Sequence, residues 1–96
     1  MINRIINNEE KLDKILGILS KLEASLEDFE NNKKTIEELN QYYGSKEWFA
    51  DKDAFENGEI KGVKAGVLSE DAVWNANENI RDLLEKMSEI SEKWRF

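Results

Sequence analysis

The chain has 96 residues and a net charge of −7, and it contains no cysteine, histidine or proline. A chain of this length forms a single domain, here residues 1–96, and buries too little surface to enclose a large cavity. The lack of cysteine excludes disulfides and thiolate metal sites and favours a reducing cytoplasm. Without cysteine or histidine, the usual zinc ligands and the usual catalytic base are missing, so we expect no cofactor and no enzyme activity.

The acidic charge is spread over the whole chain and is not concentrated in a tail. Direct binding to nucleic acid or to an anionic membrane needs clustered lysine and arginine, so we expect neither. No stretch is apolar over the roughly 18 residues of a membrane span, and the first residues lack the apolar run and cleavage site of a secretory signal. Two interpretations of the charge stay open: an ordinary solvated surface, or an acidic face that binds a basic partner or imitates a nucleic acid.

The first predicted helix covers residues 4–43. Its apolar residues follow two seven-residue series that lie three positions apart, which is the pattern of a packed helix. The first series is Ile5, Leu12, Leu19 and Leu26, and the second is Ile15, Leu22, Phe29, Ile36 and Tyr43. Leu16 and Ile18 widen the stripe, which suits a bundle better than an isolated coiled coil.

The weak point of this helix is the pair Asn31 and Asn32, because two poor helix formers are adjacent there. We predict a continuous helix, with a break within residues 31–34 as the alternative. In that alternative, Thr35 and Glu38 would form a capping box where the helix restarts.

Residues 44–68 are predicted to form an irregular connection. Gly44 ends the first helix as its C-terminal cap, Asn57-Gly58 is typical of a turn, and residues 51–56 form at most one helical turn. Connections of about 25 residues are usually functional or disordered. The aromatic residues of this one indicate order.

The last predicted helix covers residues 70–95. Ser69 is its N-cap, and Glu70 and Asp71 suit the positive end of the helix dipole. Its apolar residues repeat the pattern of the first helix, so the two should pack together. The sequence therefore predicts an all-α fold: a long antiparallel helical hairpin or small helical bundle with an ordered aromatic loop between the helices.

The two helices differ in length. A helix over residues 4–43 is about 60 Å long and one over residues 70–95 about 39 Å, so a hairpin leaves residues up to about 17 overhanging with several apolar side chains. A bend near Asn31 would give a three-helix bundle, whereas two copies could pair their overhangs in a four-helix dimer. We favour the homodimer.

The central stretch contains a set of residues that together form a family pattern: Tyr42-Tyr43-Gly44-Ser45, Glu47-Trp48, Asp51, Lys64 and the run from Gly66 to Val73. In these residues the chain resembles a bacterial family of small proteins known only as a domain of unknown function, family 4298. The resemblance covers nearly the whole chain and implies no activity. The segment Ile60-Lys61-Gly62-Val63 departs from the family pattern, which often has Leu-Pro before the lysine.

Charged motifs in this stretch have ordinary explanations. Residues 51–59 resemble a calcium loop but have Phe55 and Glu56 where a ligand and the glycine are required. Asp51, Glu70 and Asp71 could act as paired carboxylates, yet a helix N-terminus explains the last two. Residues 62–66 lack the ending of a phosphate loop. We expect Lys64 to pair with Glu70 or Asp71, or to stay solvated.

The aromatic residues allow two interpretations. Trp48, Phe49, Trp74 and the pair Tyr42-Tyr43 can form a small core that fixes the connection, or an exposed patch rimmed by acids that binds a protein. Both hold if Trp48 and Trp74 are buried while Tyr42 or Phe49 faces outward.

These patterns predict a non-catalytic protein–protein interaction module with an unidentified protein partner. One alternative is a protein that binds a small molecule or a divalent metal, or a weak hydrolase, using Asp51, Glu70 and Asp71 beside Lys64. Another is an acidic mimic of nucleic acid that inhibits a basic partner. The predicted interaction surface consists of Tyr42, Tyr43, Trp48, Phe49, Asp51, Lys64, Glu70, Asp71 and Trp74.

Overall fold

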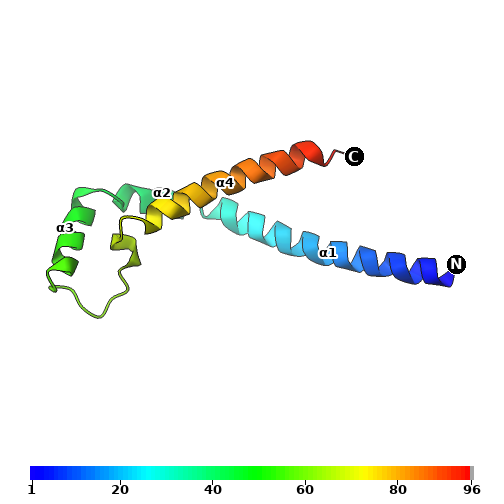
Figure 1. Ribbon diagram of the computed structural model, residues 1–96, viewed down its shortest axis with the longest axis horizontal. Coiled ribbons are helices and arrows are strands. Elements are labelled where there is room, and N and C mark those ends of the chain that lie inside the picture. Colours follow the sequence, from blue (N-terminus) through cyan, green and yellow to red (C-terminus); the bar gives the residue numbers. More distant parts are fainter. Residues whose placement is uncertain (96) are drawn as a thin grey trace. The chain divides into compact units, whose positions relative to one another are not determined.

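The computed structural model describes residues 1–95, which are helical for most of their length and contain no strand (Figure 1). The prediction of an all-α fold is therefore confirmed. The elements are α1 (Ile2–Asn31), α2 (Lys33–Tyr42), α3 (Lys46–Glu56), the short 3-10 helix η1 (Gly66–Leu68) and α4 (Ala72–Lys93). None of the helices in this part of the chain combines the length and the apolar character needed to cross a membrane.

The chain divides into two compact units, residues 1–36 and residues from Glu37 onward. The first unit consists of α1 and the first turn of α2. The second contains the rest of α2, then α3, η1 and α4. The predicted antiparallel hairpin concerns how the first and last helices pack together across these units, and it stays a prediction.

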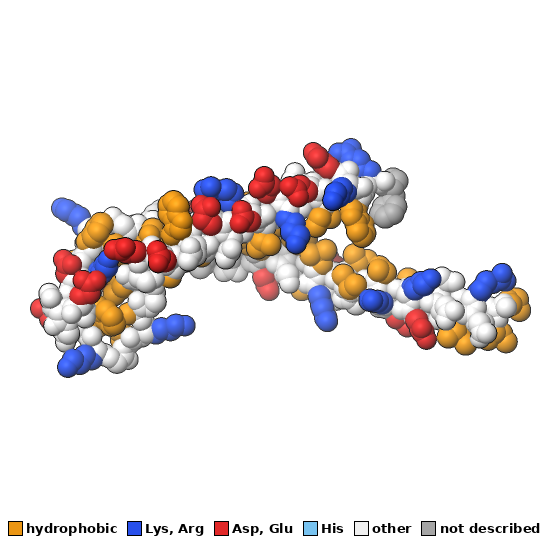
Figure 2. All heavy atoms as spheres, in the orientation of Figure 1, with side chains coloured by type: hydrophobic (Ala, Val, Ile, Leu, Met, Phe, Trp, Pro, Cys, Tyr) orange, Lys and Arg blue, Asp and Glu red, His pale blue; other side chains and the backbone are white. Residues whose placement is uncertain are grey.

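In the first unit, α1 is a single helix of 30 residues, about 45 Å long. No proline interrupts it, and Gly17 weakens it only by about 1 kcal/mol relative to alanine. Its apolar side chains form the predicted stripe and are exposed: even the least exposed of its large aliphatic side chains, Leu26, has 41% of its surface accessible. Figure 2 shows part of this stripe as hydrophobic side chains along α1.

A break separates α1 from α2 at Asn32. The prediction of one continuous helix over residues 4–43 is therefore wrong, and the alternative of a break within residues 31–34 is confirmed. The side-chain amide of Asn32 donates to the carbonyl of Asp28 (2.7 Å), and its Oδ1 accepts from the Thr35 hydroxyl (3.1 Å). An asparagine side chain that bonds to nearby backbone competes with the helix and favours a cap. The new helix begins at Lys33, so Thr35 lies within its first turn, and Asn32 is the residue just before the restart.

Within the second unit, α2 and α4 meet through a pair of asparagines. The amides of Asn40 and Asn77 exchange two hydrogen bonds, of 3.3 and 2.8 Å. Because the two amides bind each other reciprocally, they align the end of α2 with the start of α4 at one register.

The connection after α2 is more regular than predicted, because residues 46–56 form the 11-residue helix α3. Gly44 has φ +78° and ends α2 as predicted. Ser45 then begins α3 as its N-cap: its Oγ accepts from the Trp48 backbone N–H at 3.2 Å. At the other end, Gly58 has φ +76° and the Glu59 N–H bonds back to the Ala54 carbonyl at 2.9 Å. Within residues 44–68, the expected irregular structure is limited to residues 44–45 and 57–65.

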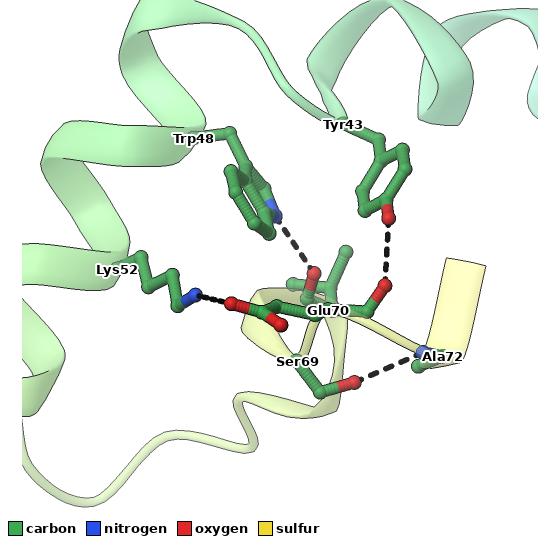
Figure 3. A network of polar contacts seen from close by, with 7 residues as sticks. Tyr43, Trp48, Lys52, Ser69, Glu70 and Ala72 are labelled. Atoms are coloured by element: carbon green, nitrogen blue, oxygen red, sulfur yellow. Dashed lines mark hydrogen bonds and ion pairs between the residues drawn. The ribbon is translucent and has the colours of Figure 1, made fainter. Parts of the chain in front are cut away.

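The last helix begins at Ala72, two residues later than predicted. Its N-cap is Asp71 and not the predicted Ser69. Ser69 still contacts the start of the helix, because its Oγ accepts from the Ala72 N–H at 3.0 Å (Figure 3). The helix ends at Lys93 rather than at residue 95.

Candidate functional site

The segment that joins α2 to α4, residues 42–74, is here named the cap, and it is organised around Trp48. Among the described residues of the whole chain, only Trp48 and Val73 are buried hydrophobic residues, with 4% and 3% of their surface exposed. The indole Nε1 of Trp48 donates to the carbonyl of Val67 at 2.9 Å (Figure 3). This bond joins α3 to η1, and it satisfies the one polar group that a buried tryptophan brings with it.

A second aromatic side chain fixes the turn before α4. The Tyr43 hydroxyl donates to the carbonyl of Glu70 at 2.7 Å. Its ring also meets Trp48 edge to face, with centroids 5.3 Å apart, in an arrangement that aromatic pairs prefer. Trp48 therefore holds η1 while Tyr43, just after α2, holds the turn that follows it, as Figure 3 shows.

Tyr42 and Asp51 form a separate contact between the end of α2 and the middle of α3. The Tyr42 hydroxyl donates to the Asp51 carboxylate at 2.6 Å. This hydrogen bond, followed by burial and by the charge of Asp51, raises the pKa of Tyr42 above its ordinary value of 10.0. The carboxylate of Asp51 is thus engaged in holding two helices together.

Lys52 makes the ion pair that we expected of Lys64. Its Nζ lies 2.9 Å from the Glu70 carboxylate and 5.3 Å from the centre of the Trp48 ring. The bond to Glu70 is the main cause that raises the pKa of Lys52 above 10.5. Lys52 lies one helical turn beyond Trp48 on α3, so both side chains face η1. Lys64 is exposed, which is the other outcome we considered for it.

Two aromatic residues of the cap stay exposed. Phe49 contacts the edge of Trp48 at a centroid distance of 4.9 Å, yet 56% of its surface is accessible. Trp74 is 59% exposed, so the expectation that it is buried beside Trp48 is wrong. The inward position at the start of α4 belongs to its smaller neighbour Val73.

An open hollow of about 450 Å³ lies where α3 faces the turn before α4. It is lined by Lys52, Phe55, Glu56, Ala65, Leu68, Ser69, Glu70 and Asp71. Asp51 is not among these residues, and neither is Lys64, so the carboxylates and the lysine that we grouped as a possible site are not all brought together. Within residues 1–95, no three acidic side chains are placed to hold a metal ion. The segment that resembled a calcium loop is helical as far as Glu56.

A second hollow, of about 420 Å³, follows the apolar face of α1 in the first unit. It is lined by Leu19, Leu22, Leu26 and the acidic residues Glu23, Glu27 and Glu30. A surface of this kind suits the side chains of another helix better than a reacting small molecule, because one helix cannot enclose a ligand.

Several residues of the predicted interaction surface make the contacts that hold the cap together, and other contacts of the cap were not predicted. Tyr42, Tyr43, Trp48, Asp51 and Glu70 all take part in the interactions described above. The missed residues of the cap are Ser45, Lys52 and Val67, and the contact between Asn40 and Asn77, next to the cap on α2 and α4, was missed as well. Two of these had a readable signal: Ser45 stands three residues before Trp48, the spacing of an N-cap contact, and Lys52 stands four residues after it.

The comparison with family models decides the classification. The model described as Domain of unknown function (DUF4298) matches residues 5–90 of the 96. The chain belongs to the DUF4298 family. No curated protein and no solved structure matches it. In this DUF4298 protein, the residues that carry the resemblance to the family include Tyr43, Trp48 and the run from Gly66 to Val73, which are the residues that bind α3 to the start of α4.

Proposed function

We propose that this DUF4298 protein is a non-catalytic protein–protein interaction module of the cytoplasm, and that its cap presents the binding surface. The observation that carries the proposal is the exposure of Phe49 and Trp74 on ordered helices whose positions are fixed by buried neighbours. Exposed aromatic side chains on a rigid support are typical anchors of protein interfaces.

The support beneath these anchors is well fixed. Phe49 directly follows the buried Trp48, and Trp74 directly follows the buried Val73. The hydrogen bonds from Trp48 to Val67 and from Tyr43 to Glu70 hold the elements that carry them. A surface ordered before binding loses little conformational entropy when a partner docks, and this favours affinity.

The charges near the anchors indicate the chemistry of the partner. Asp53 follows Phe49 by four residues on α3, and Glu78 follows Trp74 by four residues on α4, so each aromatic side chain has an acid beside it on its own helix. Figure 2 shows hydrophobic side chains beside acidic ones around α3 and the first turns of α4. The partner that fits is a protein with apolar pockets flanked by lysine or arginine.

Two observations support a non-catalytic role: carboxylates of the cap are already hydrogen-bonded, and the shifted pKa values lie far from neutrality. Asp51 is bound by Tyr42 and Glu70 by Lys52, so two of the three carboxylates that could act as acid or base are already engaged. The pKa values of Tyr42 and Lys52 are both raised, which moves them further above neutrality. A general acid or base works best with a pKa near the operating pH.

The test is to capture partners with the immobilised chain and then to measure their affinity for purified variants. Phe49→Ala and Trp74→Ala should each weaken a genuine partner at least tenfold, which corresponds to about 1.4 kcal/mol. Val63→Ala is the matched control, because Val63 is an apolar residue of the cap with 60% exposure. A partner that binds all three variants like the parent, or a measured turnover of a small molecule, would reject the proposal.

The hollow beside Glu70 favours a second candidate, the binding of a small cationic molecule. Its volume of about 450 Å³ lies in the range of ligand sites, about 300–1,000 Å³. Its charged residues are the acids Glu56, Glu70 and Asp71 and the single base Lys52, so its net charge is negative. Thermal unfolding with and without polyamines and divalent cations tests this candidate. A ligand at a hundred times its dissociation constant stabilises by about 2.7 kcal/mol, and a stabilisation that Phe55→Ala abolishes would support it.

A further inference from the structure

The apolar stripe of α1 is too long to be covered by the rest of its own chain. α1 spans about 45 Å, whereas α4 spans about 33 Å. Asn77 of α4 is already paired with Asn40 of α2, and only the stretch from Glu78 to Lys93, about 24 Å, lies beyond it. Even complete overlap with that stretch would leave about half of the stripe in water, and a surface of that kind marks an interaction site.

We infer that α1 pairs with α1 of a second copy of this chain, with the two helices parallel and in register. The seam consists of two positions in each heptad. Ile5, Leu12, Leu19 and Leu26 occupy one, and Asn8, Ile15, Leu22 and Phe29 occupy the other. Repetition of apolar residues every seven positions keeps a seam facing its partner over the full length of the helix.

The direction of the pairing follows first from Asn8, the one polar residue of the seam. In a parallel pair, Asn8 meets Asn8 of the second copy, and two amides can bond to each other across the seam. Its Nδ2 donates within its own helix to the Arg4 carbonyl at 2.7 Å, which leaves Oδ1 to accept. In the antiparallel pairing with the fullest overlap, Asn8 would face Leu26 and stay unsatisfied. A single asparagine of this kind fixes the register of parallel helices.

The charges beside the seam favour the same direction. In a parallel pair, the residue that directly precedes the Ile5 position of the seam approaches the residue five places further along the other helix. Arg4 therefore meets Glu9 of the second copy, and the symmetry of the pair forms this contact twice. In the fullest antiparallel overlap, Glu9 would instead face Glu23 of the second copy, and this repulsion would also occur twice. Opposite charges set the orientation of paired helices, and like charges oppose it.

Disulfide cross-linking tests the inference cleanly, because the chain contains no cysteine. Ile5→Cys and Leu26→Cys, each alone, should form covalent dimers under mild oxidation, since both residues face their own counterparts in a parallel pair. Glu10→Cys is the control, because Glu10 lies on the opposite face of α1 and should stay uncoupled. Light scattering of the parent should give the mass of two chains.

Three results would overturn the inference. The first is a parent of monomeric mass at micromolar concentration. The second is that neither seam variant cross-links to itself, while a mixture of Ile5→Cys and Phe29→Cys forms a mixed disulfide, which is the mark of antiparallel pairing. The third is cross-linking of Glu10→Cys as fast as Ile5→Cys. These outcomes are independent of the cap, so they leave the proposed partner-binding surface untouched.

Discussion

Replacement of Trp48 by alanine should remove most of the stability of the cap. The side chain is 4% exposed, and truncation of a buried tryptophan costs about 3–5 kcal/mol. The change also leaves the Val67 carbonyl without its donor, at about 0.5–1.5 kcal/mol. A chain of this size has roughly 5–15 kcal/mol of stability in total. We therefore expect Trp48→Ala to unfold α3 and the turn before α4 under conditions where the parent is folded.

Urea unfolding followed by far-ultraviolet circular dichroism measures this loss of stability, because that signal comes from the helical backbone and does not need the indole that the variant lacks. Trp48→Phe separates the two contributions, because it keeps an aromatic ring and removes only the hydrogen bond to Val67. Phe49→Ala is the matched control: Phe49 is the next residue on the same helix and is 56% exposed, so its truncation should cost about 1 kcal/mol or less. The reasoning fails if Trp48→Ala stays within 1 kcal/mol of the parent, or if Phe49→Ala costs as much.

Three further predictions concern pH, backbone conformation and assembly. The bond to Asp51 raises the pKa of Tyr42. The stability that this bond contributes is fully present below pH about 10, the pKa of an unfolded tyrosine, and is lost as the pH rises through the folded value. Urea midpoints should therefore fall more steeply at alkaline pH in the parent than in Tyr42→Phe, and equal slopes would contradict this. Gly44 has φ +78° and nothing within 4 Å of an added Cβ, so Gly44→Ala should destabilise the chain by about 1–2 kcal/mol through backbone strain alone. Gly17→Ala, in the middle of α1, should instead stabilise it by about 1 kcal/mol. Thermal melts that rank the two variants the other way would refute these backbone conformations. Asn8→Leu should raise the melting temperature of the assembled chain while allowing other alignments or masses; a lower melting temperature with unchanged mass in light scattering would argue against a seam at Asn8.

The parts of the fold that could be predicted are those with a long repeating signal. The heptad series runs through four turns or more in both α1 and α4, so hydrophobic periodicity alone identifies them. The apolar residues of α3 form no such stripe: Trp48, Phe49 and Ala50 are consecutive. That helix depends on a local cap at Ser45 and on burial of one tryptophan, and neither stands out against the surrounding charged residues.

The break at Asn32 and the contacts of the cap were harder to predict for a different reason. Whether an asparagine continues a helix or caps it depends on competition between side-chain and backbone hydrogen bonds worth about 1 kcal/mol. The choice between Lys52 and Lys64 as the partner of Glu70 depends on where η1 brings the turn, a matter of tertiary placement. The seven-residue apolar series of α4 includes Val73 and not Trp74, and the burial of Val73 agrees with it; the expectation that Trp74 is buried came only from grouping it with the other aromatic residues.

Two donors of the cap, Trp48 and Tyr43, both bond to carbonyl groups of the main chain, at Val67 and Glu70. Every residue type has such a carbonyl, so side chains in the turn can be exchanged without removing the acceptor. The donors, in contrast, are the indole of Trp48 and the phenol of Tyr43, and no other side chain has the same reach and shape. The tolerance of the two halves of this contact to substitution is therefore unequal: a library that randomises residues 67 and 70 should return many folded variants, whereas one that randomises residues 43 and 48 should return few.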